Sequence, residues 1–287
     1  MPLKTVLITG CGSNSIGSAL AKEFHMRGHR VFATGRSANE MDHELSILGM
    51  QTFPLDVTSE KSISEAVTKV SAATDGRLDI LINSAGLMHI MPFADTHLSD
   101  VRSQMEVNVI GVWAVTHASL PLLLEAKGLV VNFGSVNEVF CPPFFAAYNA
   151  SKAAVEAMGR TIRRELGLFG VRVVTLKTGS VKSSLFANAP AIVLPERSLY
   201  APVRDWIEGR GFTASGRFMD VDEYSRAVVT DLLREDVRPV IWRGGLVWVA
   251  WFISWLGWET IMDQALIKGN HLHKLRYTGT AEGLKSA

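Results

Sequence analysis

A glycine-rich turn near the amino terminus joins a predicted strand to a predicted helix. The apolar, β-branched run Thr5–Ile8 breaks into a loop spanning residues 9–17, and the helical pattern of residues 19–24 follows. Such a turn lets the backbone approach a pyrophosphate and points helix N-terminal amides at it, whereas an ordinary loop with scattered glycines has no such role. The chain is therefore predicted to form a doubly wound, Rossmann-type α/β fold with a parallel sheet. The loop residues expected to bind a dinucleotide are Gly10, Gly12, Asn14, Ser15, Ile16 and Gly17.

The tip of the second predicted strand indicates which dinucleotide the chain binds. Residues 30–34 form an apolar run that ends at Gly35-Arg36-Ser37. In a doubly wound sheet this tip lies beside the adenosine ribose, where an acid binds the 2′-hydroxyl and an arginine suits a 2′-phosphate. Because the tip has no acid, Arg36 predicts NADP(H) rather than NAD(H). The alternative is an arginine that only faces solvent.

Tyr148 and Lys152 are four residues apart in an alanine-rich run that predicts a helix, so both side chains leave one face. A free tyrosine titrates near pH ~10, and an ammonium beside it favours the phenolate, which brings the phenol toward acid–base use. Ser135 lies thirteen residues earlier, at the end of an apolar run, where its hydroxyl can face the phenol. Taken alone, the pair is equally consistent with a surface helix bearing a solvated lysine.

The serine, tyrosine and lysine, the glycine loop, and Asn83-Ser84-Ala85-Gly86 between them together resemble the short-chain dehydrogenase/reductase family over about residues 1–180. The resemblance implies that Tyr148 donates a proton, Lys152 lowers its pKa and holds the nicotinamide ribose, and Ser135 binds the substrate oxygen. Asn108 would be the fourth catalytic residue, in a water-linked proton path; otherwise it satisfies backbone groups. The remaining implied cofactor contacts are Asp56, Val57, Asn83, Ala85, Gly86, Thr178, Gly179 and Val181, together with Tyr148 and Lys152.

Four positions depart from the family pattern. Asn14 and Ser15 stand where further glycines are usual, Ser84 replaces a second asparagine, and Thr178 replaces a proline. Asparagine tolerates a left-handed backbone, so the longer loop remains compatible with cofactor binding. Within the family, this loop, Thr178-Gly179 and the Trp242–Gly245 segment are most similar to fungal 1-acyl-dihydroxyacetone-phosphate reductases.

Length and composition favour one catalytic domain, residues 1–240, with residues 184–220 as a substrate lid and residues 241–287 as an apolar appendage. A net charge of +1 gives no reason to expect nucleic acid as a partner. Cys11 and Cys141 are too few for a disulfide framework or a zinc site, and no metal is expected. The strand pattern begins at Leu3 without a basic and apolar leader, so we expect a cytoplasmic protein.

The predicted activity is NADPH-dependent reduction of a ketone in an apolar or lipid-like small molecule, of the acyl-dihydroxyacetone-phosphate type. One alternative is a ketoreductase of fungal secondary metabolism acting on a polyketide or alkaloid ketone. Another is a non-catalytic NADPH-binding regulator, against which the intact Ser135, Tyr148 and Lys152 argue.

The run 246–258 is thirteen residues of apolar and aromatic character, too short to cross a bilayer as a helix. Trp248, Trp251, Trp255 and Trp258 repeat at helical spacings. The run could close the substrate pocket or bury itself against a second subunit, since family members are often dimers or tetramers and a homo-oligomer is expected. Tryptophan also prefers the membrane interface, so the third interpretation is that the run associates with the endoplasmic reticulum surface or a lipid droplet.

Overall fold

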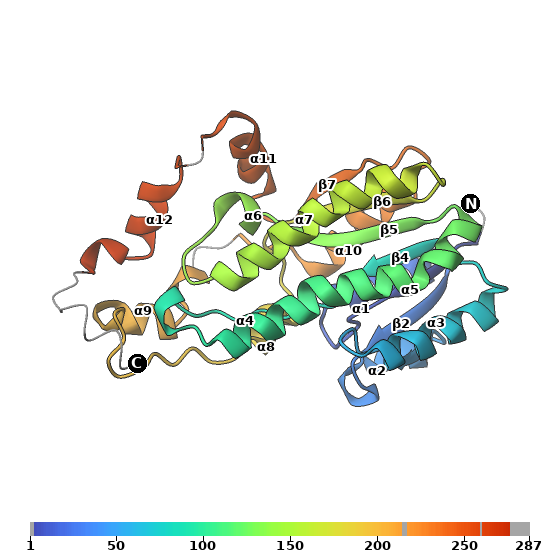
Figure 1. The fold of residues 1–287 in the computed structure, drawn as a ribbon, viewed down its shortest axis with the longest axis horizontal. Coiled ribbons are helices and arrows are strands. Elements are labelled where there is room, and N and C mark those ends of the chain that lie inside the picture. Colours follow the sequence, from blue (N-terminus) through green and yellow to red (C-terminus); the bar gives the residue numbers. More distant parts are fainter. Residues whose placement is uncertain (1–2, 214–216, 259, 276–287) are drawn as a thin grey trace.

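Seven parallel strands form one sheet in the part of the chain that the computed structural model describes, residues 3–213, 217–258 and 260–275. Their order is β3-β2-β1-β4-β5-β6-β7, so the chain runs outward from β1 to one edge and then from β4 to the other (Figure 1). This confirms the predicted doubly wound sheet. The strands are β1 Thr5–Ile8, β2 Arg30–Gly35, β3 Gln51–Pro54, β4 Ile80–Asn83, β5 Leu129–Ser135, β6 Arg172–Thr178 and β7 Val240–Arg243.

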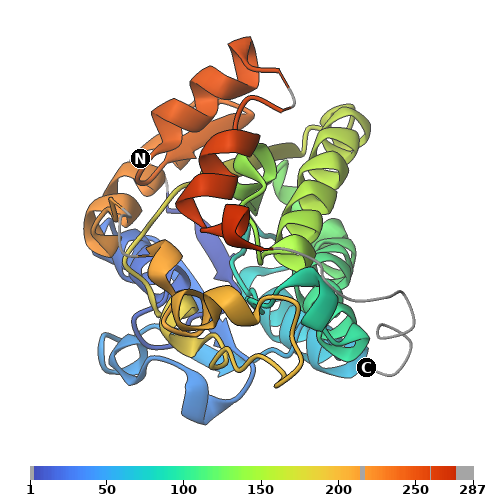
Figure 2. The ribbon, with the colours of Figure 1, turned by 90° about the vertical axis from the view of Figure 1, so that its left-hand side faces the viewer.

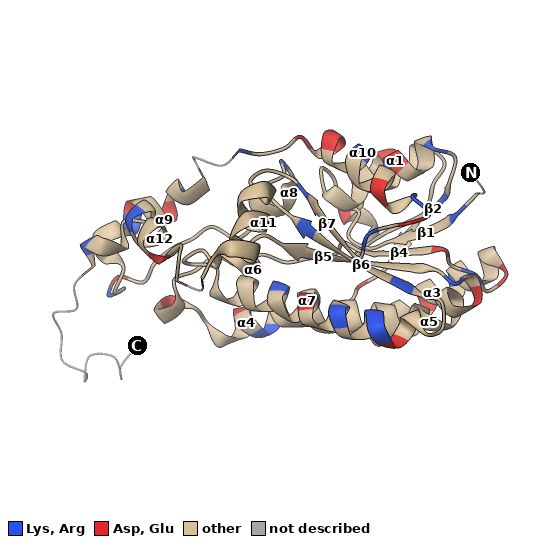
Figure 3. Cartoon of the chain, turned by 90° about the horizontal axis from the view of Figure 1, so that it is seen from above, with Lys and Arg blue, Asp and Glu red and all other residues tan. Residues whose placement is uncertain are grey.

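Helices cover both faces of the sheet. Figure 3 shows α1 and α10 on one side of the strands and α3, α5 and α7 on the other. The helices are α1 Ile16–Met26, α2 His43–Ile47, α3 Glu60–Thr74, α4 Leu98–Met105, α5 Gly111–Ala126, α6 Asn137–Phe140, α7 Ala146–Gly167, α8 Ser184–Asn188, α9 Arg204–Glu208, α10 Val221–Leu232, α11 Val247–Leu256 and α12 Asp263–Gly269.

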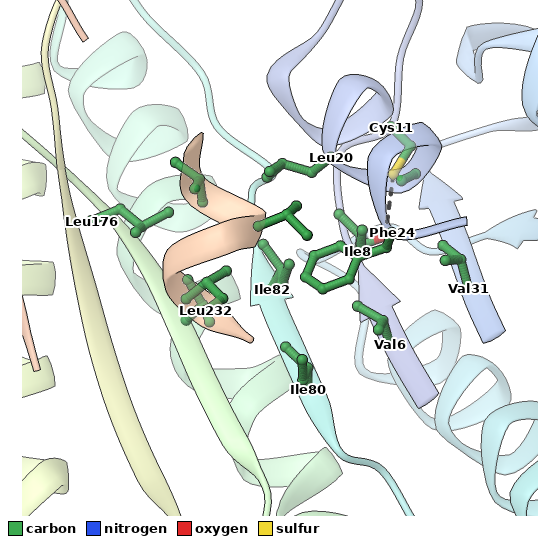
Figure 4. Packing of buried hydrophobic residues seen from close by; sticks show 14 of the residues in the cluster. Val6, Ile8, Cys11, Leu20, Phe24, Val31, Ile80, Ile82, Leu176 and Leu232 are labelled. Carbon is green, nitrogen blue, oxygen red and sulfur yellow. Dashed lines mark hydrogen bonds between the residues drawn. The ribbon is translucent and has the colours of Figure 1, made fainter. Parts of the chain in front are cut away.

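The strands are apolar on both sides because both faces of the sheet are buried. Since successive side chains of a strand point to opposite faces, Val6 and Ile8 join the cluster under α1 and α10, while Leu7 joins the cluster under α3 and α5. Figure 4 shows Phe24 and Leu20 of α1 packed over the first of these surfaces. The two clusters hold the helices against both faces of the sheet. The loops at the strand ends carry the candidate site.

The helical run from Leu98 to Ala126 is interrupted. Helices α4 and α5 are joined by a π-helical turn, Glu106–Ile110, in which the amide of Gly111 bonds to the carbonyl of Glu106. By length and hydropathy the whole run Leu98–Ala126 could span a membrane, but 44% of its most apolar window is buried within the protein. It packs as a core helix against α3 and the sheet.

The sheet extends past the expected domain boundary at residue 240. Strand β7 pairs in parallel with β6, with Thr175 opposite Val240 and Thr178 opposite Arg243. The sequence analysis did not anticipate this strand, because four residues ending in Trp-Arg show little apolar periodicity. The appendage that leaves the sheet therefore begins after Arg243 and, within the described residues, consists of α11, α12 and a turn at Leu272–Lys274.

The segment proposed as a lid contains α8, α9 and short turns at Ala201–Val203 and Gly211–Thr213; its residues 214–216 lie outside the described residues. The segment buries Ile192, Leu194 and Ile207 against Phe144 and Phe145 at the start of α7. Part of the appendage also reaches this region (Figure 2): the rings of Trp206 and His271 are 4.5 Å apart, edge to face. Whether the segment opens and closes stays a prediction.

Candidate active site

Ser135, Tyr148 and Lys152 come together at the carboxyl end of β5. Ser135 is the last residue of that strand, and α7 begins at Ala146, so Tyr148 lies in the first turn and Lys152 one turn later. The Ser135 hydroxyl is hydrogen-bonded to the Tyr148 phenol. The Lys152 ammonium lies 5.6 Å from the centre of the Tyr148 ring and donates to the carbonyl of Phe133 at 2.9 Å. All three side chains are buried.

Burial controls the protonation of this trio. It raises the pKa of Tyr148 to about 12, against the opposing effect of the hydrogen bond with Ser135. It lowers the pKa of Lys152 to about 8. The pKa of Tyr148 is raised, whereas the sequence predicted that it would be lowered. That prediction considered the nearby ammonium and not the removal of water from around the buried phenol. The phenol is thus protonated at neutral pH, as a proton donor must be.

Asn108 lies in the π turn between α4 and α5, and its carboxamide is fully bonded. Its Oδ1 accepts from the amide of Leu87 at 2.7 Å, and its Nδ2 donates to the carbonyl of Leu87 at 2.9 Å and to the hydroxyl of Ser151 at 3.0 Å. The side chain therefore ties the loop after β4 to the helix turn that holds Lys152. A part in a proton path remains a prediction, and Ser151 is a contact that the sequence analysis missed.

The glycine loop fits a dinucleotide by its close backbone contacts. Gly10 has a φ of +75°, and a Cβ there would lie 2.6 Å from the Cα of Ala85; a Cβ on Gly17 would lie 2.6 Å from the carbonyl oxygen of Gly10. Asn14 has a φ of +56°, the left-handed conformation that asparagine tolerates. Ser15 caps α1 by accepting from the amide of Ser18 at 3.0 Å. Side chains larger than those present would obstruct this turn and the helix N-terminus behind it.

Arg36 stands at the tip of β2, as predicted, with a partner that the sequence analysis did not consider. Its guanidinium forms a two-pronged ion pair with Glu40, with Nη2 at 2.6 Å and Nε at 3.1 Å from carboxylate oxygens. The arginine side chain is 70% exposed. A 2′-phosphate at this position would have to compete with that carboxylate.

The other residues expected to bind the cofactor differ in where their side chains lie. The Asn83 amide points into the core, donating at 2.9 Å both to Thr116 and to Asn132, so its side chain does not reach the loops. The Asp56 carboxylate accepts from the amide and hydroxyl of Thr58. Ala85 lies against Gly10 of the glycine loop, Gly86 lies near Asn108, and Thr178 pairs with Ser135. Gly179 instead packs against Gly245, Val181 is buried in the core cluster under α1 and α10, and Val57 packs against Gly111.

Thr178 is held by Tyr224 on α10, a contact that the sequence analysis missed. Its hydroxyl is 2.8 Å from the phenol oxygen of Tyr224 on α10, and its carbonyl accepts from the amide of Val136 at 3.0 Å. These bonds connect the end of β6 to the residue that follows Ser135. Only the tertiary fold places Tyr224 there.

An apolar cluster covers the Tyr148 side of the site. It is formed by the loop after β4, the start of α7 and the lid segment, and Leu272 of the appendage packs against it. The run 246–258 does not take part: α11 contacts α6 and β7 instead. In this structure the tryptophan-rich run contributes no buried member to the cluster, and pocket closure by it stays a prediction. The buried members of the cluster are Met88, Ile90, Phe144, Phe145, Tyr148, Ala189, Ile192, Leu194, Val203 and Ile207.

Comparison with known proteins agrees with this geometry. Residues 4–191 match the short chain dehydrogenase family model. The chain is 34% identical over 285 residues to short-chain dehydrogenase fogD of Aspergillus ruber, covering 99% of both chains. It is 39% identical over 256 residues to an NADPH-dependent 1-acyldihydroxyacetone phosphate reductase of Schizosaccharomyces pombe, covering 84% of this chain and 86% of that one.

Solved structures give the same result. A short-chain dehydrogenase from Streptomyces avermitilis superposes with a TM-score of 0.76 at 25% identity, covering 96% of this chain and 97% of that one. An alcohol dehydrogenase from Thermococcus sibiricus, complexed with 5-hydroxy-NADP, has a TM-score of 0.69 at 26% identity, covering 86% and 98%. The chain therefore belongs to the short-chain dehydrogenase family, oxidoreductases that use a nicotinamide cofactor to interconvert CH–OH and C=O groups.

Proposed function

We propose that this protein reduces a ketone with NADPH, using Tyr148 as the proton donor. The observation that carries the proposal is the buried, protonated Tyr148 phenol, bonded to Ser135 and close to the Lys152 ammonium. NADPH, when bound, supplies the hydride. The Ser135 hydroxyl donates to the carbonyl oxygen, and Tyr148 transfers its proton to that oxygen as negative charge develops. The Lys152 ammonium stabilises the phenolate that remains.

The apolar cluster around Tyr148 favours a substrate with a hydrocarbon body. Its aromatic and aliphatic side chains gain by excluding water from such a body. The S. pombe relative named for 1-acyldihydroxyacetone phosphate supports an acylated, lipid-like ketone. We therefore propose a substrate of the acyl-dihydroxyacetone-phosphate type.

A second candidate is a ketone without a phosphate, such as an aromatic polyketide or alkaloid intermediate. Two arginines of the lid segment are already engaged, which favours this candidate. Arg210 donates to the carbonyls of Phe186, Ala189 and Pro190, and Arg204 to those of Leu194 and Pro195. Neither guanidinium is therefore free to bind a substrate phosphate without breaking contacts of the lid.

A screen of NADPH oxidation tests the proposal and separates the two candidates. The informative pair is 1-acyl-dihydroxyacetone phosphate and the same molecule without its phosphate, run beside aromatic polyketide ketones and steroid ketones. Turnover that requires the phosphate supports the first candidate, and turnover of the phosphate-free ketones supports the second. Failure of every ketone to stimulate NADPH oxidation would contradict both.

Arg36 provides a prediction about the cofactor. Arg36→Asp is expected to weaken NADPH by roughly 1.5–3 kcal/mol, the range for a hydrogen bond to a charged group, and to leave NADH binding little changed. Glu40→Gln is the matched variant: because it removes the competing carboxylate, it should tighten NADPH and not NADH. Dissociation constants measured by titrating both cofactors check this. Equal wild-type affinity for the two would show that Arg36 adds nothing to binding of the 2′-phosphate.

We also propose that the protein is cytoplasmic and associates peripherally with a membrane surface through α11. Helix α11 has no charged residue (Figure 3), and Trp248, Trp251 and Trp255 are 71%, 47% and 73% exposed. Ten residues of helix span about 15 Å, half of a hydrocarbon core, so α11 would lie in the interface. Indole rings are stable at that depth, where the N–H group stays hydrated.

Flotation with phosphatidylcholine vesicles, with and without phosphatidylserine, checks this proposal. The full chain should float with the vesicles, and Trp248→Ser/Trp251→Ser should not, while NADPH binding is unchanged. Trp113→Ser on α5 is the control, because Trp113 is 59% exposed outside the appendage. The opposite outcome is a full chain that stays in the soluble fraction as an oligomer, together with a double variant that dissociates. That outcome would assign α11 to a subunit interface.

A further inference from the structure

A second buried phenol lies on the opposite face of the sheet from α7 and Tyr148. Tyr224 is in the first turn of α10, which covers that face together with α1 (Figure 3). Its ring is fully buried in the apolar cluster under these two helices, which includes Ile8 and Val228. A buried phenol needs a hydrogen-bond partner, and the Tyr224 oxygen is 2.8 Å from the hydroxyl of Thr178. Burial raises the pKa of Tyr224, so the phenol stays protonated through the neutral range.

Thr178 stands at the end of β6, directly beside Ser135. It is the last residue of its strand and pairs in register with Ser135, the last residue of β5. Its carbonyl accepts from the amide of Val136 at 3.0 Å. A proline, which the family pattern has at this position, would offer the Tyr224 phenol no hydroxyl to bind. The contact therefore depends on the threonine that distinguishes this chain from the pattern.

Two successive amides connect Thr178 to the Ser135 hydroxyl. The amide of Val136 is bonded to the Thr178 carbonyl, and the amide of Asn137 donates to the Ser135 Oγ at 3.1 Å. The same hydroxyl is hydrogen-bonded to the Tyr148 phenol. A shift of the Thr178 carbonyl would therefore move the backbone that supports Ser135 and change the direction in which its hydroxyl points.

Tyr224 limits such a shift because its ring is fixed in the core. Thr178 lies where the regular pairing of β5 with β6 ends, and the ends of elements open more readily than their centres. Protein interiors are close-packed, so the phenol oxygen has little freedom to follow a moving strand end. The backbone of β5 thus holds Thr178 within the sheet, and Tyr224 holds it from the face that α10 covers.

We propose that Tyr224 is a positioning residue for the ketone reduction, a role that rests on the proposed function. Its phenol fixes the Thr178 hydroxyl and, through the end of β6, keeps the Ser135 hydroxyl aligned with the Tyr148 phenol and the substrate carbonyl. Tyr224 acts only through Thr178 and transfers no proton in the reaction.

A kinetic cycle with Ser135 tests this role. Tyr224→Phe keeps the ring in the core and should lower kcat by about tenfold or more, with NADPH affinity close to that of the wild type. In a Ser135→Ala background the same substitution should change kcat by less than about twofold, because the hydroxyl that it positions is absent. Equal fold-losses of kcat in the two backgrounds would overturn the proposal.

Two further variants separate positioning from stability. Tyr224→Phe/Thr178→Val removes both hydroxyls and leaves neither unpaired, so its thermal unfolding midpoint should stay near that of the wild type. At saturating NADPH it should still show the kcat loss of Tyr224→Phe. Val228→Ala, one turn further along α10 in the same cluster, should lower the midpoint without that loss. A double variant with wild-type kcat, or an equal loss in Val228→Ala, would give Tyr224 a role in stability alone.

Hydrogen–deuterium exchange of the full chain gives a readout that needs no ketone. Peptides containing Val136 and Asn137 should exchange about threefold to tenfold faster in Tyr224→Phe/Thr178→Val than in the wild type, whereas peptides of β1 should be unchanged. Faster exchange in a protein that reduces no ketone would contradict the proposed function but support the positioning of Ser135 by Tyr224. Unchanged exchange at Val136 and Asn137 would refute that positioning, whatever the ketone screen shows.

Discussion

Replacing Tyr148 with phenylalanine is expected to lower kcat for ketone reduction by about 10²–10⁴-fold, the range that a positioned proton donor contributes. The ring would still fill its place among Phe144, Phe145 and Ile207, because only the phenol oxygen is removed. NADPH affinity should therefore stay close to that of the wild type. The measurement is kcat from NADPH oxidation together with the NADPH dissociation constant from fluorescence titration.

Tyr200→Phe is the matched control, since Tyr200 packs against the same apolar cluster and its burial is partial. It should keep kcat within about threefold of the wild type, as expected of a residue that transfers no proton. A Tyr148→Phe enzyme with most of its kcat would show that another group donates the proton, and the assignment of Tyr148 would be withdrawn.

Lys152→Met should lower kcat and weaken NADPH together, which distinguishes it from Tyr148→Phe. The variant loses both the ammonium that stabilises the phenolate and the group predicted to hold the nicotinamide ribose. The side chain is buried and bonded to the carbonyl of Phe133, so methionine fits the space but leaves that carbonyl without this donor. Thermal unfolding should be measured in parallel. Loss of stability with unchanged NADPH affinity would give Lys152 a structural role only.

The same lysine gives the wild-type enzyme an expected pH dependence. Because burial lowers the pKa of Lys152 to about 8, the ammonium is charged below that pH and increasingly neutral above it. NADPH affinity should therefore fall as the pH rises through about 8 and should lose this dependence in Lys152→Met. Burial also lowers the pKa of Lys177 to about 8, so Lys177→Met is the control and should retain the decline.

Local patterns predicted much of this fold because they depend on neighbours in sequence. The run Thr5–Ile8 and the alanine-rich run that contains Tyr148 each specify an element through a few adjacent residues, and both elements occur as predicted. Strand β7 was missed because its four residues become a strand only through pairing with β6. The π turn at Glu106–Ile110 was missed because the apolar pattern continues across it.

The same distinction between local sequence pattern and tertiary fold applies to the candidate site. Spacing placed Ser135 at a strand end and Tyr148 and Lys152 on one face of the next helix, and the family resemblance identified the three as one site. Spacing gave no information about burial, which sets the pKa of Tyr148 in the opposite direction to the one expected. Nor could it show that Glu40 binds Arg36 or that Tyr224 holds Thr178, because these contacts depend on the tertiary fold.

Transfer of deuterium from the cofactor to the product tests the central claim most directly. Wild-type protein, incubated with NADPH deuterated at the transferable position of the nicotinamide and with the ketones of the screen, should yield an alcohol carrying one deuterium on the former carbonyl carbon, detected by mass spectrometry. The Tyr148→Phe protein, binding NADPH equally well, should yield almost none in the same time. NADPH binding by the wild-type protein without deuterium in any alcohol product would contradict the account.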